Sequence, residues 1–205
     1  MNKGDDIIKE IHDLLDDRVD GFMESIPKVQ RQAYEEVLIL AKELDTKSDG
    51  TIKATKKNVI LISKIKQRLN EVIIDGRYMK ELQKVVDTYE KIAVLQNSYF
   101  TAMVGQFGIP SVLAEIQKQS IEITVESLGK NGLNAGVINK VRDILNKNVT
   151  TGGKISSFME EVRLYLLDSP DGDGALKKYT SQIVTDALNQ YSRQYNQILT
   201  DDLGF

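Results

Sequence analysis

The sequence predicts an all-α protein: an elongated bundle of about eight helices with a C-terminal helical sub-domain. Apolar residues return every third or fourth position through most of the chain, which is the spacing of one helix face. Only 3 prolines are present, and most of the 14 glycines fall between the periodic segments. At 205 residues and 41% hydrophobic content, the chain is long and apolar enough to bury a core.

Two helices are expected in the first 44 residues. The first spans residues 5–23, and Asp5 and Asp6 suit the positive end of its dipole. Ser25 followed by Pro27 predicts a stop and a restart, because proline is tolerated in a first turn. The second helix then runs to about Leu44.

Residues 51–75 and 77–104 predict two further helices, separated at Gly76. The β-branched run at 58–62 is also compatible with a short buried strand, but the longer frame favours a helix. The segment 106–110 is the clearest break in the chain. We therefore expect a division into an N-terminal helical region, 1–109, and a C-terminal helical domain, 110–205.

The C-terminal region reads as four helices with short connections. They span 111–128, 135–146, a segment from Ser156 or Ser157 to Leu166, and 179–205. The glycine-dense stretch 129–136 is expected to form a turn between the first two. In the first of these helices we place Ile123 on the apolar face with Leu113, Ile116 and Leu128.

The last helix carries the candidate partner interface. Its apolar stripe includes Val184, Leu188, Tyr191, Tyr195 and Ile198, so the tyrosines are expected to anchor the packing. Its opposite face is rich in amides. The predicted interface comprises Asn189, Gln190, Tyr191, Arg193, Gln194 and Tyr195, because aromatic residues and arginine are favoured at interface centres. An ordinary solvated face is the alternative.

Charge is distributed unevenly along the N-terminal region. Residues 5–24 carry eight acids, whereas 53–70 carries none. The basic side chains of the second stretch are Lys53, Lys56, Lys57, Lys64, Lys66 and Arg68. These two helices are expected to face each other as complements, or the basic face to contact nucleic-acid phosphates without sequence preference. No aromatic residue is interleaved for base stacking.

No catalytic, cofactor-binding or metal-binding set is recognised, so the chain is not expected to be an enzyme. It has no cysteine, and His12 is its only histidine, which we interpret as a surface residue. Asp168, Asp171 and Asp173 lie among glycines, but neither frame fits a calcium loop. The stretch 151–156 lacks the Ser or Thr that a phosphate loop needs after Lys154. Neither a signal peptide nor a membrane span is predicted.

Residues from about 110 to 205 resemble the helical part of the head-morphogenesis, or minor head, proteins of tailed bacteriophages. The similarity lies in the order and spacing of 112–128, 132–139, 144–152, 158–166 and 179–191, closing on 202–205. Residues 1–109 show no such resemblance. Members of this family usually continue past the Leu203-Gly204-Phe205 position, where this sequence stops.

The resemblance implies a structural virion protein at the portal vertex or in the capsid interior, acting in head assembly or in DNA packaging and ejection. Its implied partners are the portal or other capsid proteins, in multiple symmetric copies. Non-specific DNA contact is expected from the basic face alone, and no membrane partner is expected. The protein would be made in the host cytoplasm. A cytosolic helical adaptor or regulator that binds a host or phage protein is the alternative.

Overall fold

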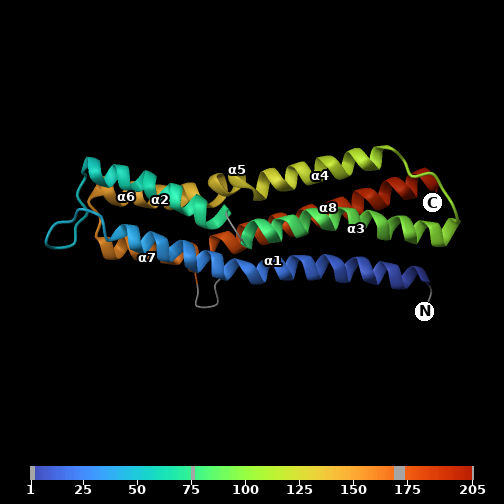
Figure 1. The fold of residues 1–205 in the computed structure, drawn as a ribbon, viewed down its shortest axis with the longest axis horizontal. Helices are drawn as coiled ribbons and strands as arrows, with labels where there is room; N and C mark the ends of the chain where they lie inside the picture. The colour runs from blue at the N-terminus through green and yellow to red at the C-terminus, as the bar shows by residue number, and fades with distance from the viewer. Residues whose placement is uncertain (1–2, 75–76, 169–173, 205) are drawn as a thin grey trace.

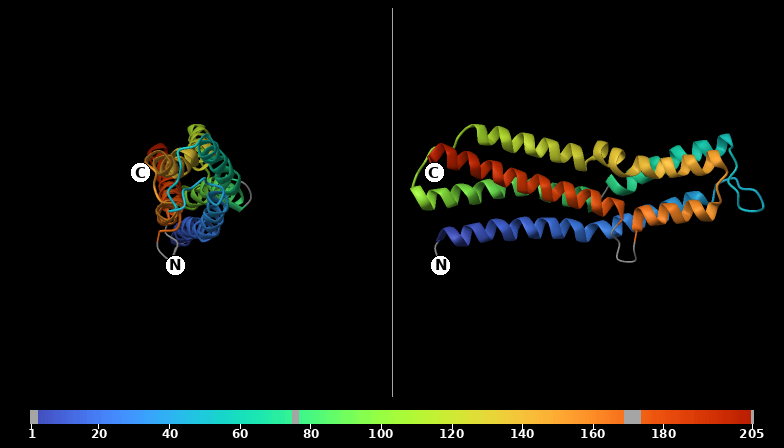
Figure 2. Two further views of the ribbon diagram at one scale, coloured as in Figure 1. Left: turned by 90° about the vertical axis from the view of Figure 1, so that its left-hand side faces the viewer. Right: turned by 180° about the vertical axis from the view of Figure 1, so that it is seen from behind.

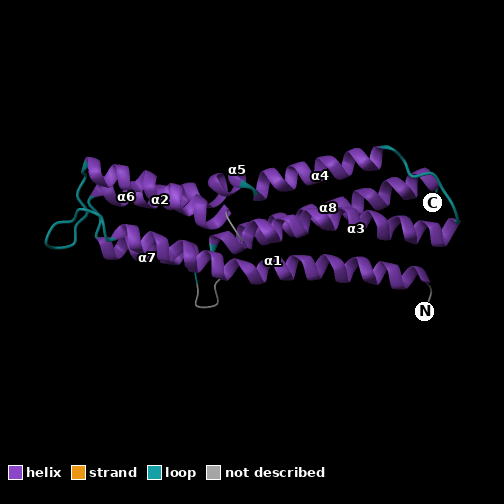
Figure 3. Ribbon diagram, in the orientation of Figure 1, coloured by secondary structure: helices purple, strands orange, loops and turns teal. Residues whose placement is uncertain are grey.

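The computed structural model describes residues 3–74, 77–168 and 174–204, and within them the fold is all-α. Helices occupy 85% of these residues, and Figure 3 shows no strand among them. The only β-type pairings there are two isolated bridges, which join Thr46 to Ile52 and Thr51 to Lys154. The predicted fold class is therefore confirmed, and the 58–62 run is helical.

Six helices make up the described chain. One of them is long and bent, and its segments are α4, α5, the π-helical turn η1, and α6. The bounds are α1 (Lys3–Ala41), α2 (Lys56–Ile74), α3 (Arg77–Val104), α4 (Val112–Leu128), α5 (Lys130–Leu133), η1 (Asn134–Ile138), α6 (Asn139–Thr151), α7 (Ile155–Leu167) and α8 (Ala175–Leu203).

The helices form four antiparallel columns that run the length of an elongated bundle (Figures 1 and 2). The first column is α1 alone, which at 39 residues is roughly 58 Å long. The second is α2 followed by α3, the third is the bent helix, and the fourth is α7 followed by α8. Consequently α1, α3, α4 and α8 surround one half of the core, and α1, α2, α6 and α7 surround the other.

The prediction of a helix stop near Pro27 was wrong, because α1 continues through this proline. An internal proline removes one helical hydrogen bond and typically costs about 3 kcal/mol. Here the neighbouring Ile26 and Val29 are buried in the core, and burial on both sides of the proline offsets that cost. The hydroxyl of Ser25 donates to the carbonyl of Phe22 over 2.7 Å, within the same turn.

The glycine-dense stretch 129–136 was also predicted wrongly, as a turn between two separate helices. The column bends there and continues through α5 and η1 into α6. Gly129 adopts an extended conformation, with φ −81° and ψ −165°. A side chain on Gly132 would overlap the carbonyl oxygen of Ser127, so the glycine permits a close approach inside the bend. These two continuations reduce the expected eight helices to six.

The second, third and fourth columns are interrupted or bent near one level, midway along the bundle, which the continuous α1 passes, and we call this level the waist (Figure 1). Tyrosine hydroxyls bind main-chain carbonyls that the bend leaves without helical partners. Tyr78 donates to Leu128 over 2.9 Å, and Tyr179 donates to Ser127 over 2.8 Å. These side chains therefore tie α3 and α8 to the bent helix.

The first turn of α8 is held at the waist by α1. The buried Gln30 side chain accepts a 2.8 Å hydrogen bond from the main-chain N–H of Lys177. The first N–H groups of a helix have no internal acceptor, so Gln30 satisfies one of them. The ring of Phe22, also on α1, packs 5.1 Å from the ring of Tyr78 on α3.

The loop between α1 and α2 closes the far end of the bundle against the turn between α6 and α7. Main-chain N–H groups of Ile52 and Ile155 donate to Gly153 and Gly50, over 2.9 and 3.0 Å. The ammonium group of Lys154 contacts the Asp49 carboxylate at 2.7 Å. The turn at 151–156, whose sequence does not fit a phosphate loop, is thus a structural contact.

Residues from both sides of position 109 contribute to the core. Ile92 and Phe100 on α3 are buried with Leu188 on α8, and α1 packs against α7 and α8 as well as against α2 and α3. The expected boundary falls in the connection between α3 and α4, and a division into domains there stays a prediction. Across the described residues, no helix is both long enough and apolar enough to cross a membrane.

Candidate partner-binding face

The candidate face lies on α8, in the half of the bundle that holds both chain ends (Figure 1). Gln190, Arg193 and Gln194 are exposed, and Asn189 is half-buried. Asn189 donates a 2.9 Å hydrogen bond to the carbonyl of Thr185 in its own helix. Across the part of the chain that the structure describes, the other three have no internal hydrogen-bond partner, so they remain available to another molecule.

The two tyrosines predicted within this interface lie beneath the face, in the core. Tyr191 is 0% exposed and Tyr195 is 2% exposed, so neither side chain lies on the molecular surface. The Tyr191 ring packs edge-on against Tyr89 of α3 at 4.8 Å and lies 5.7 Å from the Tyr195 ring. The Tyr195 hydroxyl donates to the Asn97 side chain over 3.0 Å. The tyrosines therefore fix α8 on α3 and position the polar face above them.

Burial raises the pKa of the Tyr191 hydroxyl, with smaller contributions from Tyr195 and Tyr89. Burial also raises the pKa of Tyr195, which its hydrogen bond with Asn97 partly offsets. Both side chains are consequently neutral near pH 7. Among the predicted interface residues, Arg193 is the one that carries a positive charge.

A groove between α4 and α8 borders one side of the face. Its volume is about 450 Å³, and Gln190 and Gln194 form part of its wall. The α4 wall includes Ile116 and Ile123. Ile123 is 63% exposed, which corrects its expected place on the apolar face of α4. This groove combines an apolar wall with amide groups, which can both donate and accept hydrogen bonds.

A second groove, between α8 and the N-terminal half of α1, borders the opposite side. Its volume is about 290 Å³, and it is lined by Asn189 and Arg193 of α8 with Ile8 and His12 of α1. His12 is exposed, in agreement with its interpretation as a surface residue. The polar face is thus a ridge between two shallow grooves, an arrangement that the spacing along α8 alone does not reveal.

The predicted phosphate-contact residues on and before α2 lie at the other end of the bundle. Three are paired with acids of this chain: Lys57 with Asp45 at 2.9 Å, Lys64 with Glu43 at 3.3 Å, and Arg68 with Glu36 at 2.9 Å. Lys53 and Lys56 are exposed and Lys66 is half-buried, and within the described residues these three form no ion pair. A contact with DNA phosphates therefore stays a prediction, with Lys53 and Lys56 best placed for it.

The expected pairing of the basic helix with acids 5–24 was wrong. The acids that meet α2 are Glu36, Glu43 and Asp45, from the C-terminal end of α1 and the loop after it. The reason is that α1 spans the whole bundle, so its first half lies beside α3 and α8 rather than α2 (Figure 1). The hydrogen bond from Arg68 lowers the pKa of Glu36, and that from Lys57 lowers the pKa of Asp45.

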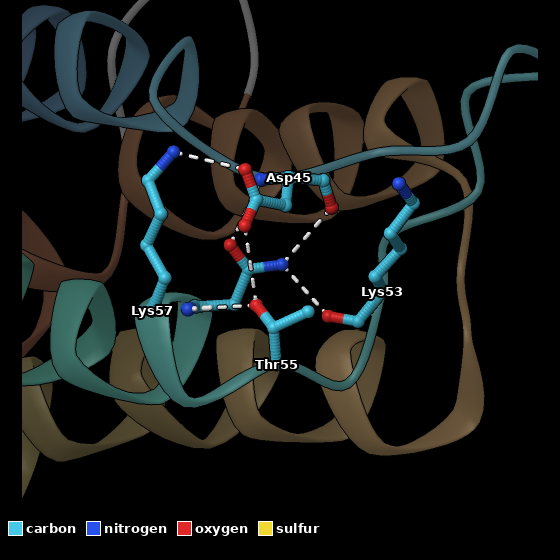
Figure 4. A network of polar contacts seen from close by, with 5 residues as sticks. Asp45, Lys53, Thr55 and Lys57 are labelled. Carbon is cyan, nitrogen blue, oxygen red and sulfur yellow. Dashed lines mark hydrogen bonds and ion pairs between the residues drawn. The ribbon is translucent and has the colours of Figure 1, made fainter.

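A polar network anchors the start of α2 beside these ion pairs (Figure 4). The buried Asn58 side chain donates to the carbonyls of Asp45 and Lys53 over 3.0 and 2.7 Å, and accepts from the Asp45 N–H over 2.9 Å. The Asn58 N–H donates to the Thr55 hydroxyl over 3.2 Å, as in a helix N-cap. This network has a structural role, because it fixes the loop before α2 to the first turn of that helix.

One remaining candidate site, the calcium-like loop, falls only partly within the described residues. Asp171 and Asp173 of the calcium-like loop lie outside the described residues, and the Asp168 carboxylate pairs with Lys178. Nowhere in 3–74, 77–168 or 174–204 do three or more His, Cys, Asp or Glu side chains gather in a way that would hold a metal ion.

Comparison of this chain with models of known protein families, with curated proteins and with solved structures found no match in any of the three.

Proposed function

We propose that this chain is a structural, non-enzymatic virion protein, a minor head protein of a tailed bacteriophage that binds the portal or another capsid protein through α8. The observation that carries the binding role is the exposure of Gln190, Arg193 and Gln194 directly above buried tyrosines. The placement in a virion is supported by the sequence resemblance of residues 110–205.

The surroundings of this face favour protein binding. Its backbone is held in place by the packing of Tyr191 on Tyr89, so little conformational entropy is lost there when a partner binds. Arginine is enriched at interface centres, and the amides of Gln190 and Gln194 match a polar partner surface. The two flanking grooves, of about 450 and 290 Å³, offer room for side chains of the partner.

The test is binding of the full chain to a purified portal ring, measured by light scattering and by titration at fixed salt. The informative variant carries Gln190→Ala, Arg193→Ala and Gln194→Ala together. Its matched control carries Asn131→Ala, Lys140→Ala and Asn146→Ala, which removes one cation and two amides from exposed positions of the bent helix. We expect the α8 variant to bind about tenfold or more weakly and the control to bind like the unmodified chain.

A complex of defined stoichiometry that depends on the α8 residues supports the proposal. If the unmodified chain binds neither the portal nor other capsid proteins, and is absent from purified particles, the virion role is wrong. Equal loss in both variants contradicts the assignment of the face, because it points to general charge effects. A cytosolic adaptor is distinguished by its recovery with a cellular protein and never with particles.

A further inference from the structure

A third groove, between α1 and α3, is lined by more cations than acids. Its volume is about 390 Å³. The charged side chains that line it are Arg18, Glu24, Lys28, Arg77, Glu81 and Lys84. Four of these are cations and two are acids, in a chain whose net charge is −3.

The acids neutralise only part of this charge. Lys84 pairs with Glu81 at 2.8 Å, which leaves three cations and Glu24. Arg18, Lys28 and Arg77 make no ion pair with any residue that the structure describes. Like charges held together in a groove raise the local positive potential and attract anions. The groove is therefore suited to a ligand with more than one negative charge.

The Arg18 side chain adds a more specific observation. Its Nε atom is buried and has no hydrogen-bond partner among the described residues. A guanidinium N–H that is removed from water without an acceptor is unfavourable, and an oxyanion oxygen is a strong acceptor for it. Arg77, which also lines the groove, is the first residue of the 28-residue helix α3. The positive end of that helix dipole adds to the attraction.

Gly21 lies in the same groove, on the exposed side of α1. A Cβ atom added there would meet nothing within 4 Å, so packing does not require glycine at this position. Glycine inside a helix is less favourable than alanine, yet here it leaves the groove open. The described lining contains no aromatic side chain on which a base could stack, so a small oxyanion fits better than a nucleoside.

We propose that the α1–α3 groove is a binding site for a small, multiply charged phosphate anion of the diphosphate class, held by the guanidinium groups of Arg18 and Arg77 with Lys28. Arginine presents a fork of N–H donors that matches two phosphate oxygens, and lysine contributes a point charge. This site is separate from the α8 face, so its test does not depend on the proposed portal binding.

The experiment is isothermal titration of the full chain with diphosphate at constant ionic strength, with sulfate and single-stranded DNA as the other ligands. We expect saturable 1:1 binding of diphosphate. Arg18→Gln and Arg77→Gln should each weaken it about tenfold or more. The matched control, Lys118→Gln with Lys140→Gln, removes two exposed cations of the bent helix and should leave the affinity unchanged.

Arg18→Lys keeps the charge but removes the Nε donor, so it should also weaken binding while leaving the helical circular dichroism unchanged. This variant keeps the test valid if Arg18→Gln disturbs folding. Absence of saturable diphosphate binding overturns the proposal, as does equal weakening by the control variant. Binding of DNA without binding of diphosphate also overturns the proposal, because the groove would then bind the phosphate backbone of a nucleic acid and not a small anion.

Discussion

The hydroxyl of Tyr78 donates a 2.9 Å hydrogen bond to the main-chain carbonyl of Leu128, 50 residues further along the chain. Tyr78 is 0% exposed, and Leu128 is the last residue of α4, where the column bends. The bend removes the helical donor that this carbonyl would otherwise have. A side chain from α3 thus completes the hydrogen bonding of a helix that it does not belong to.

Replacing Tyr78 with phenylalanine should destabilise the fold by about 1–3 kcal/mol, because the Leu128 carbonyl would be left buried without its donor. The phenylalanine ring would keep the contact with Phe22. Urea unfolding followed by circular dichroism measures the change. Tyr99→Phe is the control, since the half-buried Tyr99 hydroxyl makes no hydrogen bond within the described chain. Equal effects of the two substitutions would remove the argument for the Leu128 bond.

The buried tyrosines should also make the fold sensitive to alkali. Burial raises the pKa of Tyr78, with a smaller contribution from Tyr179, and burial raises the pKa of Tyr191 as well. The unfolded chain titrates near the ordinary value of about 10. Above that pH the unfolded state loses protons that the folded state keeps, so the stabilisation is complete below about pH 10 and declines as pH rises.

Urea unfolding between about pH 8 and pH 11 measures this decline, and Tyr78→Phe should make it shallower. The variant is needed because lysines titrate in the same range and change the stability for other reasons. An identical pH dependence in the unmodified chain and in Tyr78→Phe would show that Tyr78 does not contribute to it.

Periodicity along the sequence predicted which segments are helical, because each helix buries a stripe on a shared core. Val184, Leu188, Tyr191 and Tyr195 were expected on the inner side of the last helix, and all four are buried. The two errors in helix number arose where local signals and tertiary packing disagree. Burial around Pro27, and the capping of the Ser127 and Leu128 carbonyls by tyrosines from other helices, keep those columns continuous.

The candidate face was predictable only in part. The spacing on α8 correctly separated Gln190, Arg193 and Gln194 from the buried side. The grooves beside them depend on α1 and α4, which come from distant parts of the sequence. The exposure of Ile123 was missed, although Leu113, Thr124 and Leu128, the buried residues of α4, define a stripe that excludes it.

We expect the buried Asn58 to keep the α1–α2 loop in its folded conformation. Its side chain makes three hydrogen bonds with the main chain of Asp45 and Lys53. Asn58→Ala leaves the Asp45 N–H without its acceptor, whereas the Asp45 and Lys53 carbonyls still accept from the main-chain N–H groups of Lys53 and Thr55. The substitution should cost about 1–3 kcal/mol. Amide hydrogen exchange should rise in residues 45–55 first, because Asn58 pins both ends of this loop.

Ser63→Ala, at an exposed position on the same helix, is the control for Asn58→Ala. It should change neither the unfolding free energy nor the exchange of the loop. If Asn58→Ala leaves hydrogen exchange in residues 45–55 unchanged, then the main-chain contacts of Ile52 and Ile155 hold the loop without help from Asn58.

Replacement by phenylalanine should change the stability in opposite directions at Tyr191 and Tyr78. Its ring packs against Tyr89 and Tyr195, so Tyr191→Ala should cost about 3 kcal/mol. Its hydroxyl oxygen, however, is buried with no hydrogen-bond partner in the described residues. Tyr191→Phe keeps the ring and removes this unpaired group, so it should stabilise the fold by up to about 1 kcal/mol.

Tyr195→Phe is the matched comparison on the next turn of the same helix. It loses the 3.0 Å bond to Asn97 and should destabilise the chain by about 1 kcal/mol. Opposite signs for these two substitutions in urea unfolding would establish that packing, and not hydrogen bonding, holds Tyr191 under the α8 face. A loss above about 1 kcal/mol in Tyr191→Phe would contradict this, and would mean that the hydroxyl is satisfied from the α4–α8 groove that Tyr191 lines.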